Sequence, residues 1–168
     1  MSIFSIFIIY LSVSFIVSSI FKAISFRYFI NNTRGIISNL VHLPLGFLSI
    51  LSAFLICSEF GSGIWILFFG YKLAAYVLAT LILIVSNIVI VIDLIFSKEK
   101  SDCGCYGEFI KEKNNISKVG MNFIMILLLV VIIFNGFNLR INTTYFTFGI
   151  TIVILHLGLI YCRNKLDF

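Results

Sequence analysis

Long uncharged runs of apolar residues alternate with short polar segments along this chain. The first run covers residues 3–21 and ends at Lys22. Because about 20 apolar residues in a helix cross the hydrocarbon core of a bilayer, this run predicts a membrane-spanning helix. A cleaved signal peptide is the alternative interpretation. The run lacks a basic segment before it and a small-residue cleavage site after it, so we expect a retained helix.

The second apolar region, residues 45–96, is too long for a single crossing. One helix over this region would measure about 75 Å at about 1.5 Å per residue, whereas the bilayer core is about 30 Å thick. A turn at 59–63 would leave a short helix followed by an overlong one. A turn at 70–72 gives two helices of similar length, over 44–69 and 73–96, and we predict this hairpin.

Two more apolar runs, at 119–139 and 145–162, predict a fourth and a fifth span. The segment 22–35 mixes cations with aromatic residues, which is typical of a connector at the level of the lipid headgroups. The predicted fold is therefore all-α: a polytopic transmembrane helical bundle with a four-helix core and a fifth, C-terminal helix.

The composition supports a membrane protein. Of the 168 residues, 61% are hydrophobic and only 11% are charged, whereas a soluble domain has about 25% charged residues. We expect a multi-pass protein of the cell membrane, most simply the bacterial cytoplasmic membrane, with the lipid bilayer as a partner. The net charge of +5 does not indicate nucleic-acid binding, because Lys and Arg in membrane proteins mostly report sidedness and lipid contact.

The cations also predict an orientation. If the chain crosses five times, the connector 22–42, the loop 97–118 with its five lysines and the C-terminal tail fall on one face. The opposite face keeps only Lys72 and Arg140. The positive-inside rule then places the N-terminus outside and the 97–118 loop in the cytoplasm, together with the C-terminus.

The 97–118 loop contains Cys103-Gly104-Cys105, the leading candidate for chemistry in the chain. Two thiols that are separated by one residue can close a small, strained disulfide ring. Strained disulfides are the easily reduced, catalytic kind. Gly104 permits backbone angles that ring closure needs. Four nearby lysines favour the thiolate, although Asp102 and Glu108 oppose them. This pattern points to a dithiol that exchanges electrons with a partner thiol protein.

Two other interpretations of the pair stay open. The thiols could capture a soft metal such as Cu(I) or Zn, but the pair supplies only two ligands and has no histidine beside it, so we assign no metal site. Alternatively, the two cysteines are incidental loop residues.

Two further residues are candidates for the same chemistry. Cys162 ends the fifth predicted span on the membrane face of the cysteine loop, where it is either a resolving thiol or a buried small residue. Glu59 lies within the second predicted span, where a carboxylate is costly and suggests function. It is either a proton acceptor during thiol oxidation or a partnered residue, paired with Lys22, Lys72 or a backbone donor near Gly61 and Gly63.

The remaining cysteine and the histidines carry weaker signals. Cys57 lies two residues from Glu59, and residues at this spacing do not share a helix face, so a Cys57–Glu59 dyad is not expected. His42 and His156 show no metal-ligand spacing, and we expect interfacial or core histidines.

The order of these features is similar to a known family. A basic residue follows the first helix ("FKAISFRYF"), Pro44 opens the second, Glu59 lies within it, "GYKLAA" starts the third, and "DCGCYG" follows. Over about residues 1–137 the chain resembles the methylamine utilisation MauE family within the broader DoxX-like group of redox-associated membrane proteins. Tyr106 stands where the family pattern favours Phe.

The resemblance implies a four-helix membrane bundle that helps to make or maintain disulfides beside a thioredoxin-like partner. On that basis Cys103 and Cys105 match the redox pair, and Lys22 and Glu59 match polar positions in the bundle core. Methylamine need not be the substrate. We expect a MauE/DoxX-like domain over 1–137, including the loop, and an additional helix and charged tail over 138–168, which departs from the family pattern.

The primary hypothesis is a membrane redox accessory protein that relays electrons through the Cys103/Cys105 pair to or from a thioredoxin-fold partner. As an enzyme in its own right, a thiol-disulfide oxidoreductase component, it would need an electron acceptor such as a quinone, and no motif identifies one. The alternative is a small transporter or a bacteriocin-type immunity protein with incidental or metal-binding cysteines. Disulfide formation usually serves the extracytoplasmic side, which conflicts with the orientation that the lysines predict.

Overall fold

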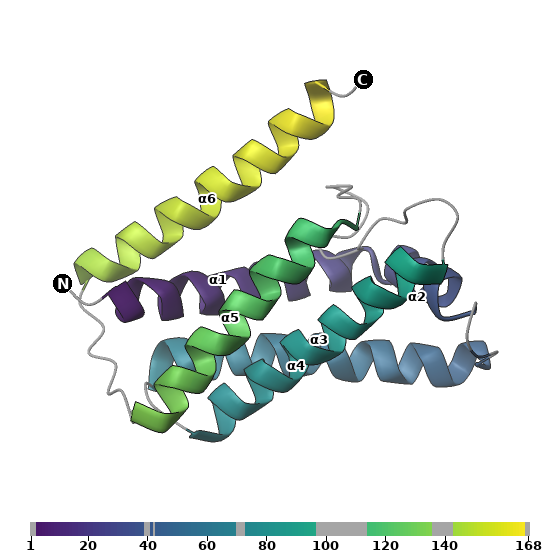
Figure 1. Ribbon diagram of the computed structural model, residues 1–168, viewed down its shortest axis with the longest axis horizontal. Coiled ribbons are helices and arrows are strands. Elements are labelled where there is room, and N and C mark those ends of the chain that lie inside the picture. Colours follow the sequence, from purple (N-terminus) through teal and green to yellow (C-terminus); the bar gives the residue numbers. More distant parts are fainter. Residues whose placement is uncertain are drawn as a thin grey trace.

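The computed structural model describes residues 3–38, 41, 43–69, 73–96, 114–135 and 143–166, and these residues form helices and short connections without a strand. Figure 1 shows the helices arranged as an elongated bundle. In chain order they are α1 (Ile3–Ile24), α2 (Phe26–Ile37), α3 (Leu45–Phe69), α4 (Leu73–Phe96), α5 (Ile116–Asn135) and α6 (Thr143–Leu166).

Four of the described helices, α1, α3, α4 and α5, are long and apolar enough to cross a membrane. Large apolar side chains such as Phe54, Phe68 and Phe134 are exposed on the outside of the bundle. A lipid bilayer solvates such a surface, whereas water does not. The prediction of an all-α, multi-pass membrane bundle is therefore confirmed.

The bounds of α3 and α4 agree with the predicted hairpin, because α3 ends at Phe69 and α4 begins at Leu73. The start of α3 follows the single proline of the chain. The backbone N–H of Leu48 donates a hydrogen bond to the carbonyl of Pro44 at 3.1 Å. Pro44 thus stands just before the first turn, where a missing N–H does no harm.

The predicted connector 22–35 is itself mostly helical. The first helix extends beyond Lys22 to Ile24, and α2 begins at Phe26. The break falls at Ser25, whose hydroxyl donates to the carbonyl of Phe21 at 2.7 Å. Such side-chain bonds to the backbone compete with regular helix geometry and bend the chain.

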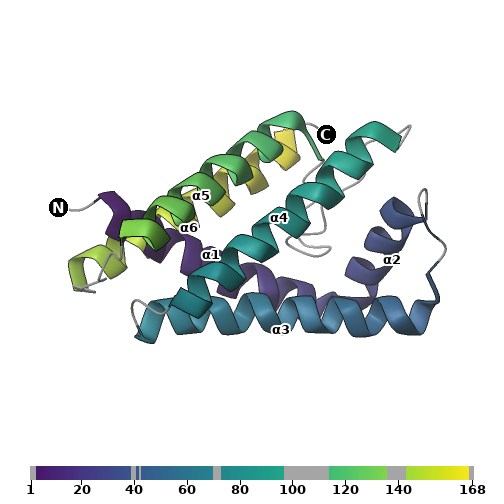
Figure 2. The same ribbon diagram turned by 60° about the horizontal axis from the view of Figure 1, so that its bottom comes forward.

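The second helix, α2, has an apolar and a polar face. It buries Phe29, Ile30 and Ile36 and exposes Arg27 and Arg34. Figure 2 shows α2 standing at the end of α3, at an angle to the long helices. This amphipathic pattern and terminal position agree with the predicted interfacial location.

The tightest packing joins helices through small residues. The first helix packs against α3 and α6, and α4 packs against α3 and α5. At Gly63 of α3, an added Cβ would lie 2.9 Å from the backbone oxygen of Ser12 in α1. At Gly149 of α6, it would overlap Ile9. Small residues at such crossings let transmembrane helices approach closely.

The last helix, α6, differs in extent from the predicted fifth span. It continues to Leu166, four residues beyond 145–162, into the segment predicted as a charged tail. In the described part of α6 the apolar stretch is Gly149–Cys162, which is shorter than the four spans. Figures 1 and 2 show α6 running in the direction of α1. This direction suits a fifth crossing, which stays a prediction, as do the domain limits 1–137 and 138–168.

Candidate functional site

The Cys103/Cys105 pair lies outside the described residues, as do the turn at 70–72 and His42. The two helix ends that carry the cysteine loop are described. Helix α4 ends at Phe96 and α5 begins at Ile116, at the end of the bundle where α2 packs against α3 and α4. We refer to Asp93, in the last turn of α4, and Asn114, just before α5, as the two feet of the cysteine loop.

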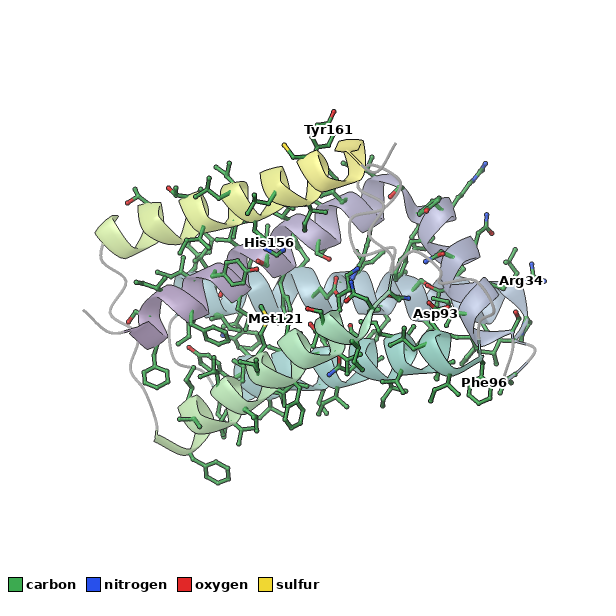
Figure 3. The ribbon with its side chains drawn as sticks, turned by 45° about the horizontal axis from the view of Figure 1, so that its top comes forward. Arg34, Asp93, Phe96, Met121, His156 and Tyr161 are labelled. Atoms are coloured by element: carbon green, nitrogen blue, oxygen red, sulfur yellow. The ribbon has the colours of Figure 1, made fainter. Side chains whose placement is uncertain are left out.

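A buried hydrogen bond joins the two feet of the cysteine loop. The amide Nδ2 of Asn114 donates to Oδ2 of Asp93 at 2.8 Å, and both side chains have 0% exposure. Figure 3 shows Asp93 near the end of α4. Because the acceptor is a carboxylate in a low-dielectric setting, the bond belongs to the stronger class of hydrogen bonds. It holds the start and end of the loop together.

The second foot has a helix cap. The backbone N–H of Lys118 donates to Oδ1 of Asn115 at 2.9 Å. Asn115 is therefore the N-cap of α5, a position that asparagine favours. This cap starts α5 at Ile116, three residues before the predicted span 119–139.

The Glu59 carboxylate forms a buried ion pair with Lys22. The Lys22 Nζ lies 2.6 Å from Oε1 and 2.8 Å from Oε2 of Glu59, and each residue is 4% exposed. The pair links α1 to α3. Of the partners weighed for Glu59, the structure thus selects Lys22, and it confirms both residues as polar positions of the bundle core.

An aromatic ring packs against the ammonium group. The Lys22 Nζ also lies 5.3 Å from the centroid of the Phe29 ring in α2, a cation–π contact. The pair thus connects three helices. The role of Glu59 as proton acceptor stays a prediction.

A cavity of about 280 Å³ lies beside this ion pair. Lys22 and Glu59 form part of its wall, together with residues of α1, α4, α5 and α6. On α1 the lining residues Tyr10, Ser14, Ser18 and Lys22 recur every four positions, which places them on one helix face. Asn115, Ser117 and Lys118 also line the cavity, so it lies at the feet of the cysteine loop.

The other two cysteines lie at the surface of the described structure. Cys57 is exposed whereas Glu59 is buried, which confirms that they do not form a dyad. Cys162 is also exposed, so the interpretation as a buried small residue is wrong. Its role as a resolving thiol stays a prediction.

His156 of α6 faces the first helix. Its ring meets Tyr10 edge to face, with centroids 6.1 Å apart, and it lines the cavity. Figure 3 shows His156 on the inner side of α6 and Tyr161 on the outer side. The expectation of a core histidine agrees with this place.

Several residues of the site were not predicted. The Asp93–Asn114 bond joins residues whose separation, 21 positions, gives no periodic signal. The serine stripe on α1 does carry a signal, since Ser14, Ser18 and Lys22 share the four-residue spacing of one helix face. Serines are common in membrane helices, so the stripe becomes meaningful only beside the cavity.

The fold and the site define a class: a multi-pass helical membrane protein with a buried ion pair beside a cavity of apolar and polar side chains, and with a cysteine-containing segment between α4 and α5. The sequence profile of one family, described as methylamine utilisation protein MauE, matches residues 1–135. The chain belongs to the MauE family, and this membership suggests a membrane accessory protein in methylamine utilisation. No curated protein and no solved structure matches the chain.

The matched residues coincide with structural elements. The family match ends at Asn135, the last residue of α5. It thus includes the four helices that are long enough to span a membrane, the cysteine loop and the Lys22–Glu59 pair. Helix α6 lies outside it.

Proposed function

We propose that the protein is a membrane redox accessory that relays electrons through Cys103 and Cys105 to or from a thioredoxin-fold partner. The observation that carries the proposal is the position of the thiol pair in a family-matched loop whose two feet are joined by the buried Asp93–Asn114 bond. Both described ends of this loop lie at the same end of the bundle, and we expect the cysteines to meet a soluble partner there.

The exchange chemistry follows from the pair itself. A thiolate of one cysteine attacks a disulfide of the partner and forms a mixed disulfide, which the second cysteine then resolves. The partner leaves as a dithiol and the Cys103–Cys105 disulfide remains. The reverse sequence oxidises the partner. Both directions balance, because two electrons and two protons move between the two dithiol/disulfide couples.

Removal of one thiol of the Cys103/Cys105 pair is expected to trap the partner. In a Cys57→Ala/Cys162→Ala background, Cys105→Ser should leave Cys103 joined to a thioredoxin-fold protein in a mixed disulfide that accumulates in membranes. Non-reducing electrophoresis and mass spectrometry of the adduct provide the measurement. The matched control is Cys103→Ser/Cys105→Ser in the same background, which should form no adduct.

The trapping experiment also separates the proposal from its alternatives. A transporter or immunity protein with incidental cysteines would yield no thioredoxin-fold adduct with Cys103→Ser or with Cys105→Ser. That result, with normal protein levels in the membrane, would contradict the redox relay.

A further inference from the structure

We propose that the cavity between α1, α4 and α5 binds the head group of a lipophilic quinone, which accepts the electrons of the Cys103/Cys105 dithiol. The electron transfer rests on the proposed function, whereas the binding site rests on the cavity alone. Four features of the cavity support the inference. They are its position among the spanning helices, its volume, three lining side chains without a hydrogen-bond partner, and the charges of its lining residues.

The cavity lies within the membrane-spanning part of the bundle. It is lined from α1, α4 and α5, three of the helices that are long and apolar enough to span a membrane. A ligand dissolved in the lipid can reach such a site between helices. The volume of about 280 Å³ is close to the lower end of the range for small-molecule sites, about 300–1,000 Å³. It suits a compact ring rather than a whole lipid.

Three polar side chains in the cavity wall have no hydrogen-bond partner among the residues that the structure describes. Ser14 of α1, Ser86 of α4 and Asn122 of α5 line the cavity, and none of them forms a side-chain hydrogen bond with another described residue. Unsatisfied hydroxyl and amide groups are costly in a membrane protein. A bound molecule with hydrogen-bond acceptors would satisfy these donors from three helices at once.

The charge of the cavity favours an acceptor-rich ligand over a cation. Lys22, Lys118 and His156 contribute donors to the wall, and Glu59 is the one carboxylate among the described lining residues. Both oxygens of that carboxylate already accept from Lys22. A quinone has two carbonyl acceptors on a flat apolar ring. The apolar side chains of Phe15, Met121 and Met125 provide walls for such a ring.

The cavity also lies at the described end of the cysteine loop, where α5 begins. Asn115, Ser117 and Lys118 of its wall are among the last residues of the segment 97–118, at the start of α5. Oxidation of the Cys103/Cys105 dithiol to a disulfide releases two electrons and two protons. A quinone takes up both electrons and both protons and becomes a quinol, so the step balances without another reactant.

The test uses the full-length protein, purified in detergent, and decylubiquinone as the probe. Equilibrium dialysis should show saturable binding. Ser86→Leu, which fills the cavity and removes a donor, should weaken binding about tenfold or more. The matched control is Ser58→Leu, because Ser58 is a half-buried serine of α3 that does not line the cavity. It should bind like the wild type. Should Ser86→Leu not fold, Asn122→Leu replaces it.

Two further measurements distinguish quinone binding in the cavity from electron transfer by the Cys103/Cys105 pair. Cys103→Ser/Cys105→Ser should bind decylubiquinone normally but should not reduce it, whereas the reduced wild type should convert it to the quinol. Binding without reduction by the wild type would overturn the electron transfer and retain the ligand site. Absence of saturable binding, or equal weakening by Ser58→Leu and Ser86→Leu, would overturn the site, as for a cavity that holds only water.

Discussion

Replacement of Glu59 by leucine should destabilise the folded bundle by about 3–5 kcal/mol, because it leaves the buried ammonium group of Lys22 without its partner. Lys22→Met should have a similar cost, since it leaves the carboxylate of Glu59 buried and unpaired. The pair is almost fully enclosed, with both residues 4% exposed. Solvent therefore compensates little for the loss of either partner.

The double variant Lys22→Met/Glu59→Leu should recover most of this stability. An apolar pair of similar volume avoids the desolvation cost of both charges. The free energies of unfolding of the wild type, both single variants and the double variant form a double-mutant cycle. They can be measured by circular dichroism during unfolding with SDS in mixed micelles. Additive costs in the double variant would contradict a direct Lys22–Glu59 coupling.

Replacement of Gly63 by leucine should cost about 3 kcal/mol, near the upper end of the usual overpacking penalty. A Cβ at this position would lie 2.9 Å from the backbone oxygen of Ser12 and 2.9 Å from Cγ1 of Ile16. The backbone oxygen cannot rotate away as a side chain can. Helices α1 and α3 would have to separate, which would also pull Lys22 from Glu59.

Gly61 provides a matched control two residues away on the same helix. An added Cβ at Gly61 has no other atom within 4 Å, and the residue is exposed. Gly61→Leu should change the free energy of unfolding by less than about 1 kcal/mol, with the gain in helix propensity as the main effect. Equal costs of the two leucine variants, measured by the same SDS titration, would refute a close α1–α3 contact at Gly63.

The apolar runs predict the spanning helices because a bilayer selects for length and hydrophobicity. The choice between turns at 59–63 and 70–72 could be made for the same reason, since it rests on helix length. The helix ends are less predictable. The backbone of Ser25 leaves helical geometry after α1 (φ −103°, ψ 40°), and the side chain of Asn115 caps α5, so local features set both boundaries.

The site is predictable in part. A carboxylate inside a span indicates an important position, and the sequence singles out Glu59 on that ground. It does not choose among the partners, because Lys22 is 37 residues away and only the packing of α1 on α3 brings them together. The cavity depends on gaps between α1, α4 and α5. No single helix reveals such a gap.

The orientation of the bundle across the membrane stays a prediction, and the count of cations on which it rests changes at Lys22. Lys22 counts as a connector cation in the sequence, but in the structure its charge is buried against Glu59. Arg27 and Arg34 of α2 remain exposed at that end of the bundle. The lysines of the cysteine loop therefore contribute most to the predicted cytoplasmic location of the loop.

A redox titration of the Cys103/Cys105 pair tests the central claim most directly. In membranes with Cys57→Ala/Cys162→Ala, mass-tagged alkylation after equilibration with defined glutathione or dithiothreitol buffers counts the free thiols. The account predicts one two-electron transition within one chain, at a potential between about −120 and −270 mV, the range of thiol-exchange proteins. Two thiols that stay reduced at every potential in this range, or that form only disulfides between chains, would contradict it.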